Sequence, residues 1–269
     1  MRGSASNNIG SLPHDRIREA LRETADLILP YRCAVCGRLS DTEERFRNYD
    51  DLYLKIFGKE SELHICGKCL SAFNTIEENR RWSLCLSNPI ENDECPGLAL
   101  FMPFNYRGIV ERTIPKIKFG KQIELARLLG CLLGSGLLLE GIRADLVVPV
   151  PLSPERLAER GFNQAAQIAY PVAVLNGIPY AGDVLIKTKD TKRQSEINDN
   201  VLRSNNVTDA YSVSDSWDLT GMTVAVVDDV STTGATLHEA AKALYRAGAS
   251  KVLCVAFAGN RQNKNAEMF

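Results

Sequence analysis

An acidic pair followed by a hydroxyl-rich turn is the segment of this sequence best suited to chemistry. Residues 222–237 begin with a β-branched apolar run, continue with Asp228 and Asp229, and end in small residues around Gly234. A glycine-bearing turn at a helix N-terminus presents backbone N–H groups and the positive end of the helix dipole to an anion. Hydroxyl side chains add further donors at Ser231, Thr232, Thr233 and Thr236. We therefore expect the turn to bind a phosphate monoester; a simple Asx or Ser/Thr cap of the helix is the alternative.

The two carboxylates need a different task, because they would repel a phosphate placed directly beside them. Carboxylate oxygens suit sugar hydroxyls, or a magnesium ion that bridges to those hydroxyls. The turn on its own therefore predicts a ribose 5-phosphate, with the ribose diol near Asp228 and Asp229.

Two cysteine pairs have the spacing of metal-binding knuckles. Cys33 and Cys36 form one C-x-x-C pair, and Cys66 and Cys69 form a second. Two intervening residues let both sulfurs of a pair reach one tetrahedral ion, so the pairs together predict a closed four-thiolate zinc site. A closed site leaves no position for water, and we expect this zinc to be structural. A redox-active disulfide pair is the alternative, although the βαβ context of such pairs is missing here.

The other cysteines do not extend this pattern. Cys85 and Cys95 are too far apart for a knuckle, and either add to a second metal site or are thiols in a turn-rich linker. Cys131 and Cys254 lie in apolar segments, where a cysteine is typical of a small core residue.

Two further segments carry side chains that bind anions. Residues 145–151 predict a strand that ends in a proline-marked turn, and the segment after it contains Arg156 and Arg160. A second apolar strand at 183–187 ends in Lys187 and leads into a basic stretch that contains Lys192. We interpret this stretch as a loop that closes over a pyrophosphate; a solvated charged loop is the alternative.

The elements that must position these residues alternate between strand and helix from about residue 100 onward. Apolar residues at helical spacing follow the turn and end at Gly248, and a strand at 252–258 completes a βαβ unit. Such alternation indicates an α/β domain with a mainly parallel, Rossmann-like sheet flanked by helices. Residues 33–99 lack a long apolar period and need a metal as a staple. An approximate helical pattern at 15–29 predicts one further helix.

Composition narrows the class of protein. The chain has 269 residues, 45% hydrophobic and 24% charged, with a net charge of −1, which argues against tight nonspecific DNA binding. The longest apolar stretch, at 128–139, falls short of the ~20 residues that a membrane span needs. A secretory signal is not evident, so we expect an intracellular, cytoplasmic protein without membrane insertion.

The segment 224–237 resembles the phosphoribosyl pyrophosphate (PRPP) motif of type I phosphoribosyltransferases. Taken together with motifs elsewhere in the chain, it resembles more specifically the ComF family. This family is also called GntX-like and is linked to competence for DNA uptake. The motifs that carry this resemblance are P-V-P at 149–151, R-G-F-N-Q at 160–164, Thr191 with Gln194, Arg203 with Asn206, and the segment 228–236, together with F-N-Y at 104–106 and K-I-K-F-G at 116–120. The four-cysteine finger is the usual partner of the transferase domain in this family.

The resemblance implies a fold, a division of the chain into domains, and roles for individual residues. The fold is that of type I phosphoribosyltransferases, with an N-terminal tail and helix at 1–32, a zinc-finger region at 33–99 and a transferase domain at 100–269. Asp228 and Asp229 match the acids that hold the ribose hydroxyls. The loop that cradles the 5-phosphate corresponds to Ser231, Thr232, Thr233, Gly234, Ala235 and Thr236. The residues expected to bind pyrophosphate are Arg156, Arg160, Lys187 and Lys192.

Members of the family often carry a third C-x-x-C pair, for which Cys85 and Cys95 are too far apart. Three further positions depart from the family pattern. Pro115 interrupts the segment before Lys116 and Lys118, and Pro171 is expected to kink or end its helix near Tyr170. Lys187 stands where an arginine is common, so it meets a pyrophosphate as a point charge rather than as a bidentate fork.

The function implied is displacement of pyrophosphate from PRPP, with magnesium, by a nitrogenous, nucleobase-like acceptor that the sequence does not identify. The hood that selects this acceptor is expected at 106–121. The alternative is a PRPP-sensing, non-catalytic module that binds single-stranded DNA or a competence protein. Its candidate surfaces are the zinc finger and a lysine cluster with neighbouring aromatic residues: Lys116, Lys118, Lys121, Phe119 and Tyr106.

Overall fold

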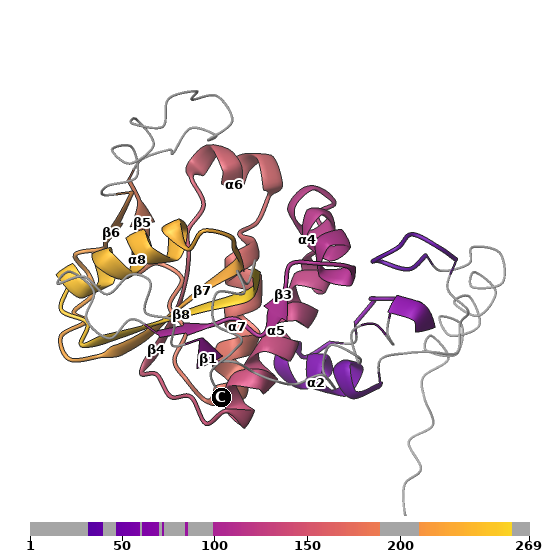
Figure 1. Cartoon of the computed structure of the whole chain (residues 1–269), viewed down its shortest axis with the longest axis horizontal. Helices are drawn as coiled ribbons and strands as arrows, with labels where there is room; N and C mark the ends of the chain where they lie inside the picture. Colours follow the sequence, from indigo (N-terminus) through magenta and orange to yellow (C-terminus); the bar gives the residue numbers. More distant parts are fainter. Residues whose placement is uncertain are drawn as a thin grey trace, which may run out of the picture.

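A computed structural model describes residues 32–39, 47–59, 61–69, 72, 84–85, 99–188 and 210–259 of the chain (Figure 1). The helix expected at 15–29, Lys192 with the rest of its basic stretch, and Cys95 lie outside these residues.

The described strands form one main sheet and one small sheet. The main sheet has the order β1-β2-β8-β7-β4, with β3 also paired to β8. Its strands are β1 (Leu84–Cys85), β2 (Ala99–Phe101), β3 (Phe104–Asn105), β4 (Leu146–Pro149), β7 (Thr223–Ser231) and β8 (Lys251–Gly259). All neighbours in it run parallel except β1, which pairs antiparallel with β2. The small sheet pairs β5 (Leu185–Lys187) with β6 (Tyr211–Val213). The predicted α/β class with a mainly parallel sheet is confirmed.

Helices cover both faces of the main sheet (Figure 1). The described helices are α2 (Arg47–Phe57), α4 (Ile109–Phe119), α5 (Ile123–Leu139), α6 (Pro154–Arg160), α7 (Gln164–Asn176) and α8 (Ala235–Arg246). The predicted βαβ unit is present as β7, α8 and β8. α5, which contains the apolar stretch at 128–139, has 17 residues, and none of the helices in the described part is both long and apolar enough to cross a membrane.

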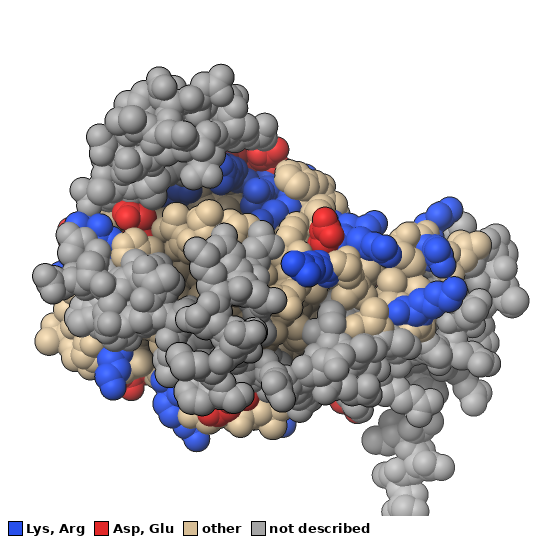
Figure 2. All heavy atoms as spheres, in the orientation of Figure 1, with Lys and Arg blue, Asp and Glu red and all other residues tan. Residues whose placement is uncertain are grey.

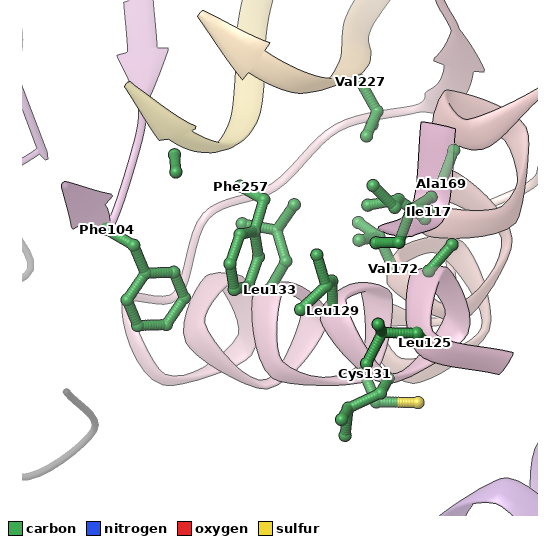
Figure 3. Packing of buried hydrophobic residues seen from close by; sticks show 14 of the residues in the cluster. Phe104, Ile117, Leu125, Leu129, Cys131, Leu133, Ala169, Val172, Val227 and Phe257 are labelled. Atoms are coloured by element: carbon green, nitrogen blue, oxygen red, sulfur yellow. The ribbon is translucent and has the colours of Figure 1, made fainter. Parts of the chain in front are cut away.

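Alternation along the central strands sorts their side chains between two clusters of the core. Ala225 and Val227 of β7 pack with α5 and α7 on one face, whereas Val224 and Val226 pack with α8 on the other. Successive side chains of a strand point to opposite faces, and a strand buried on both faces is therefore apolar throughout. Figure 3 shows Phe257 beside Leu133 of α5, and Val227 on the side of Ile117 and Ala169.

α5 and α7 pack so closely that glycine is required between them. A Cβ atom on Gly130 would lie 2.5 Å from the carbonyl oxygen of Ile168 and 3.0 Å from Cγ of Pro171. We expected Pro171 to kink or end its helix near Tyr170; α7 continues to Asn176, so the expected end is wrong. The buried ring of Pro171 instead packs into the space that Gly130 leaves. Pro115 is likewise accommodated inside α4.

The four-cysteine region packs onto this core through α2. Tyr53 of α2 is fully buried, and its hydroxyl group donates to Glu124 of α5 and accepts from Arg127. The guanidinium group of Arg127 also lies 4.4 Å from the ring centroid of Phe57. Cys33 and Cys69 belong to the same buried cluster as α5 and α7. The described part of the region between the cysteine pairs therefore shares one hydrophobic core with the main sheet and its helices.

Candidate functional site

The acid pair lies near the carboxyl end of β7, between two parallel neighbours. β7 pairs with β4 through Val227 and with β8 as far as Ser231, so Asp228 lies opposite Ala256 of β8. The amide of Asp229 donates to Oδ1 of Asp228 at 2.8 Å, and the amide of Val230 donates to Oδ1 of Asp229 at 2.8 Å. Ligands of open α/β sheets bind beyond this end of the strands, which is where the predicted ribose-binding acids lie.

Burial and mutual repulsion govern the charge of this pair. Burial, followed by the negative charge of Asp229, raises the pKa of Asp228 to about 7, although Lys118 opposes the shift. Asp229 is buried and forms an ion pair with Lys118 of α4, with 2.9 Å between Nζ and Oδ2. The protein thus supplies one cation of its own to the pair, and Asp228 remains partly protonated near neutral pH.

The hydroxyl-rich turn lies between the acid pair and α8. Gly234 adopts a left-handed conformation, with φ of 79°, and is the N-cap of α8, which starts at Ala235. Its lack of a Cβ makes this conformation accessible. Thr232, Thr233 and Thr236 are exposed, and Ser231 is buried at the end of β7. The predicted phosphate-binding residues therefore occupy one turn at a helix N-terminus, a position that favours an anion.

Arg160 is oriented by the start of α7. Its Nη1 donates to Oε1 of Gln164 at 2.9 Å, and its guanidinium group lies 5.9 Å from the ring centroid of Phe119 on α4. Gln164 is buried; its Nε2 and Nε of Arg160 have no hydrogen-bond partner among the described residues. Asn163 caps α7 through the amide of Ala165 and donates to the carbonyl oxygen of Val150. The R-G-F-N-Q motif thus holds Arg160 next to the end of β4.

Lys187 and Arg156 meet around a tyrosine. Lys187 lies opposite Tyr211 in the β5–β6 pair, with Nζ 5.7 Å from the ring centroid. Burial raises the pKa of Tyr211; the charge of Asp228 adds to this effect and Arg156 opposes it. Tyr211 therefore shares its electrostatic surroundings with one acid and two of the predicted pyrophosphate-binding cations.

The sequence interpretation missed two residues of this site. Lys118 was assigned to a surface cluster with Lys116 and Lys121, yet it pairs with the buried Asp229. The apolar residue Ile114, one helical turn before Lys118, places this lysine on the buried face of α4 but does not identify Asp229 as its partner. Tyr211 lies in a short strand beyond the basic stretch, and no motif marked it.

The four cysteines of the two predicted pairs come together at a separate location, beside α2. Their sulfur atoms all lie within 4.8 Å of one another, and those of Cys36 and Cys66 are 3.6 Å apart. A tetrahedral zinc ion with Zn–S bonds of about 2.3 Å requires S···S distances of roughly 3.8 Å. The amide of Cys36 also approaches Sγ of Cys33 at 3.5 Å, which suits a thiolate. The cluster fits one metal ion, and its four ligands leave no open position.

Comparisons with known proteins show what this chain is similar to. Residues 147–268 match the family model described as phosphoribosyl transferase domain. The DNA utilization protein YhgH of Escherichia coli strain K12 is 30% identical over 177 residues, which are 62% of this chain and 73% of that protein. The competence protein ComFC of Bacillus subtilis strain 168 is 30% identical over 148 residues, which are 54% of this chain and 57% of that protein. A solved structure of glutamine PRPP amidotransferase from B. subtilis is 26% identical, covers 49% of this chain and 25% of its own, and superposes with a TM-score of 0.34.

The raised pKa of Asp228 predicts that Asp228→Asn stabilises the ligand-free protein in a pH-dependent way. The carboxyl group titrates near about 7 in the folded chain but near about 3.9 in an unfolded one, so folding loses stability as the pH rises between these values. Asparagine escapes this loss. We expect the melting temperature at pH 8 to rise by about 3–6 °C and the gain at pH 4.5 to be small. Thermal scans without added magnesium or PRPP measure both. Asp215→Asn, on an exposed loop, is the matched control and should show no such trend; an equal gain for Asp228→Asn at both pH values contradicts the prediction.

The four-sulfur cluster predicts about one zinc ion per chain by elemental analysis. Cys36→Ser should lower the zinc content severalfold and the melting temperature by roughly 10 °C, because the cluster is part of the shared core. Cys131→Ala is the matched control. Cys131 is buried in α5 and does not belong to the four-cysteine cluster, so its loss should cost stability without loss of zinc. Zinc-free wild type of unchanged stability would refute the prediction.

Proposed function

This chain belongs to the ComF family and has a phosphoribosyltransferase domain, and from that premise we propose that it binds PRPP and transfers the phosphoribosyl group to a nitrogenous acceptor. One juxtaposition supports the proposal more than any other: the acid pair at the end of β7 adjoins the Gly234 turn at the start of α8. A ligand that places a diol on carboxylates and a phosphate on a helix N-terminus needs both in this order.

We assign each group of residues a part of the ligand. Asp228 and Asp229 hold the ribose hydroxyls. The turn from Ser231 to Thr236 binds the 5-phosphate through backbone amides and hydroxyl groups. Arg156, Arg160 and Lys187, with Lys192 from the basic stretch, bind the pyrophosphate as cations. Gln164 and Asn163 support Arg160 from behind.

The reaction breaks the bond between C1 of the ribose and the pyrophosphate oxygen, and forms a bond from C1 to the acceptor nitrogen. Pyrophosphate leaves with the bonding electrons, and the acceptor nitrogen releases its proton. Positive charge grows on the sugar ring meanwhile, so fixed carboxylates at its hydroxyls stabilise the transition state. Magnesium, when bound with PRPP, offsets charge on the leaving group, and the carboxylate oxygens of the acid pair are donors that suit it.

The zinc-binding region and α4 have roles of their own in this proposal. We propose that 100–269 is the catalytic module, and that 33–99 binds structural zinc and supports α5 through α2. The hood that selects the acceptor is α4 with its flanks, because its C-terminal end approaches both Asp229 and Arg160.

Calorimetric titration of PRPP with magnesium tests the site. Wild type should bind saturably, and Asp228→Asn/Asp229→Asn should weaken binding by at least about 30-fold, because both ribose-binding carboxylates are neutralised. Asp215→Asn should bind as wild type does. Acceptors are then screened for release of pyrophosphate. A folded, zinc-loaded wild type that does not bind PRPP rules out this function.

A non-catalytic DNA-binding module is the second candidate, because relatives are named for DNA utilization and competence. Phe119, at the end of α4, is 69% exposed and lies between Lys116 and Lys121 in the sequence. Its ring is therefore available for base stacking. For this function we expect binding of single-stranded DNA that weakens steeply with salt, with a log–log slope of about −0.7 per phosphate contact. Lys116→Ala/Lys121→Ala should reduce that binding and its salt slope. The same variant should leave PRPP binding unchanged, which separates the DNA surface from the nucleotide site.

A further inference from the structure

The ion pair between Lys118 and Asp229 places a cation of the α4 hood inside the acid pair. The side chain of Lys118 is 26% exposed and that of Asp229 is 8% exposed, so the contact lies at the edge of the buried site. Lys118 comes from a helix outside the βαβ unit, and its position is set by the buried face of α4. It therefore belongs to the site without being part of the acid-and-hydroxyl motif.

The residue next to Lys118 brings a second cation to the same place. Phe119 lies against the guanidinium group of Arg160, so the ends of α4 and α6 meet near the end of β7. Nε of Arg160 has no hydrogen-bond partner in the described part of the chain. Figure 2 shows Lys and Arg side chains gathered in this region, beside α6 and α4. Two cations with spare donors suit an anionic group larger than the single carboxylate of Asp229.

The two ends of the proposed ligand make opposite demands on Lys118. Ribose hydroxyls need the oxygens of Asp229, one of which Lys118 occupies. The pyrophosphate is the most highly charged part of the ligand, and a lysine on a flexible four-carbon stem can change partners without movement of its helix. One rotation of this side chain satisfies both demands.

On the basis of the proposed function, we propose that Lys118 is a ligand-binding residue that changes partners. In the free protein it neutralises Asp229; when the ribose hydroxyls bind Asp229, its ammonium group turns to the pyrophosphate. Lys118 thus keeps the acid pair from repelling the incoming anion and then joins Arg160 on the leaving group. A purely structural tether between α4 and β7 is the competing account.

Two ligands that differ only in the pyrophosphate separate these accounts. PRPP and ribose 5-phosphate, each with magnesium, are titrated calorimetrically into wild type, Lys118→Met, Lys118→Arg and Arg112→Ala. Methionine keeps the length of the stem and removes the charge, and arginine keeps the charge. Arg112 is an exposed cation of the same helix that is not assigned to PRPP. Zinc content and melting temperature verify that each variant is folded.

We expect Lys118→Met to weaken the binding of PRPP by about 20-fold or more and the binding of ribose 5-phosphate by less than about threefold. Lys118→Arg should restore most of the affinity for PRPP, and Arg112→Ala should leave both ligands unchanged. Equal weakening of both ligands, or of neither, overturns the role of Lys118 and leaves PRPP binding standing. Wild type that binds ribose 5-phosphate but not PRPP, or binds neither, overturns the proposed function as well.

A second measurement applies if Lys118→Met does not fold. Asp229→Asn frees Lys118 from its partner, so inorganic pyrophosphate should bind more tightly to this variant than to wild type, by about fivefold. Lys118→Arg/Asp229→Asn retains the cation and should keep the gain, whereas Lys118→Gln/Asp229→Asn should lose it. A gain that survives the glutamine substitution refutes the change of partner.

Discussion

Two adjacent carboxylates at the buried end of a central parallel strand are the constraint on which the arrangement of this site depends. A buried charge is costly unless it is paired or neutralised, and each acid is managed differently. Asp229 receives an amide and the ammonium group of Lys118, whereas Asp228 has its pKa raised toward neutrality. The position of α4 follows from this need, because it must deliver Lys118 to the end of β7. If the protein occupied every oxygen of both carboxylates, none would be left to accept a hydrogen bond from a ligand.

The same strand explains why the acids are rigid. β7 pairs on both sides, and its side chains pack into both clusters of the core, so neither face can shift independently. Close-packed interiors transmit small displacements. The turn at Gly234 begins where this rigid strand ends, and the backbone amides of the turn are thereby fixed relative to Asp228. A flexible loop could carry the same residues but not the same spacing.

Local pattern was sufficient to predict the βαβ unit, the acid pair and the turn, because their residues are neighbours in the chain. The two cysteine pairs were also readable, since their spacing reflects the geometry of one metal ion. Contacts between segments that are distant in the chain could not be predicted from the sequence. Nothing in the sequence pairs Lys118 with Asp229, or Tyr53 with Glu124 and Arg127. Pro171 misled the prediction because its penalty depends on the neighbouring helix, where Gly130 makes room for the ring.

α7 links the metal-binding region to the site through two glutamines one helical turn apart. Gln167 accepts from Arg127, which also donates to Tyr53 of α2, while Gln164 accepts from Arg160. Residues at this spacing share one side of a helix, so the docking of α2 and the orientation of Arg160 depend on the same segment of α7. If a metal ion bound by the cysteines were lost, α2 would pack less firmly and Arg127 would lose the partner that it has in Tyr53. The resulting displacement would pass through Gln167 and α7 to Gln164 and Arg160. The four-cysteine region is therefore connected to Arg160 through packing and hydrogen bonds within one hydrophobic core.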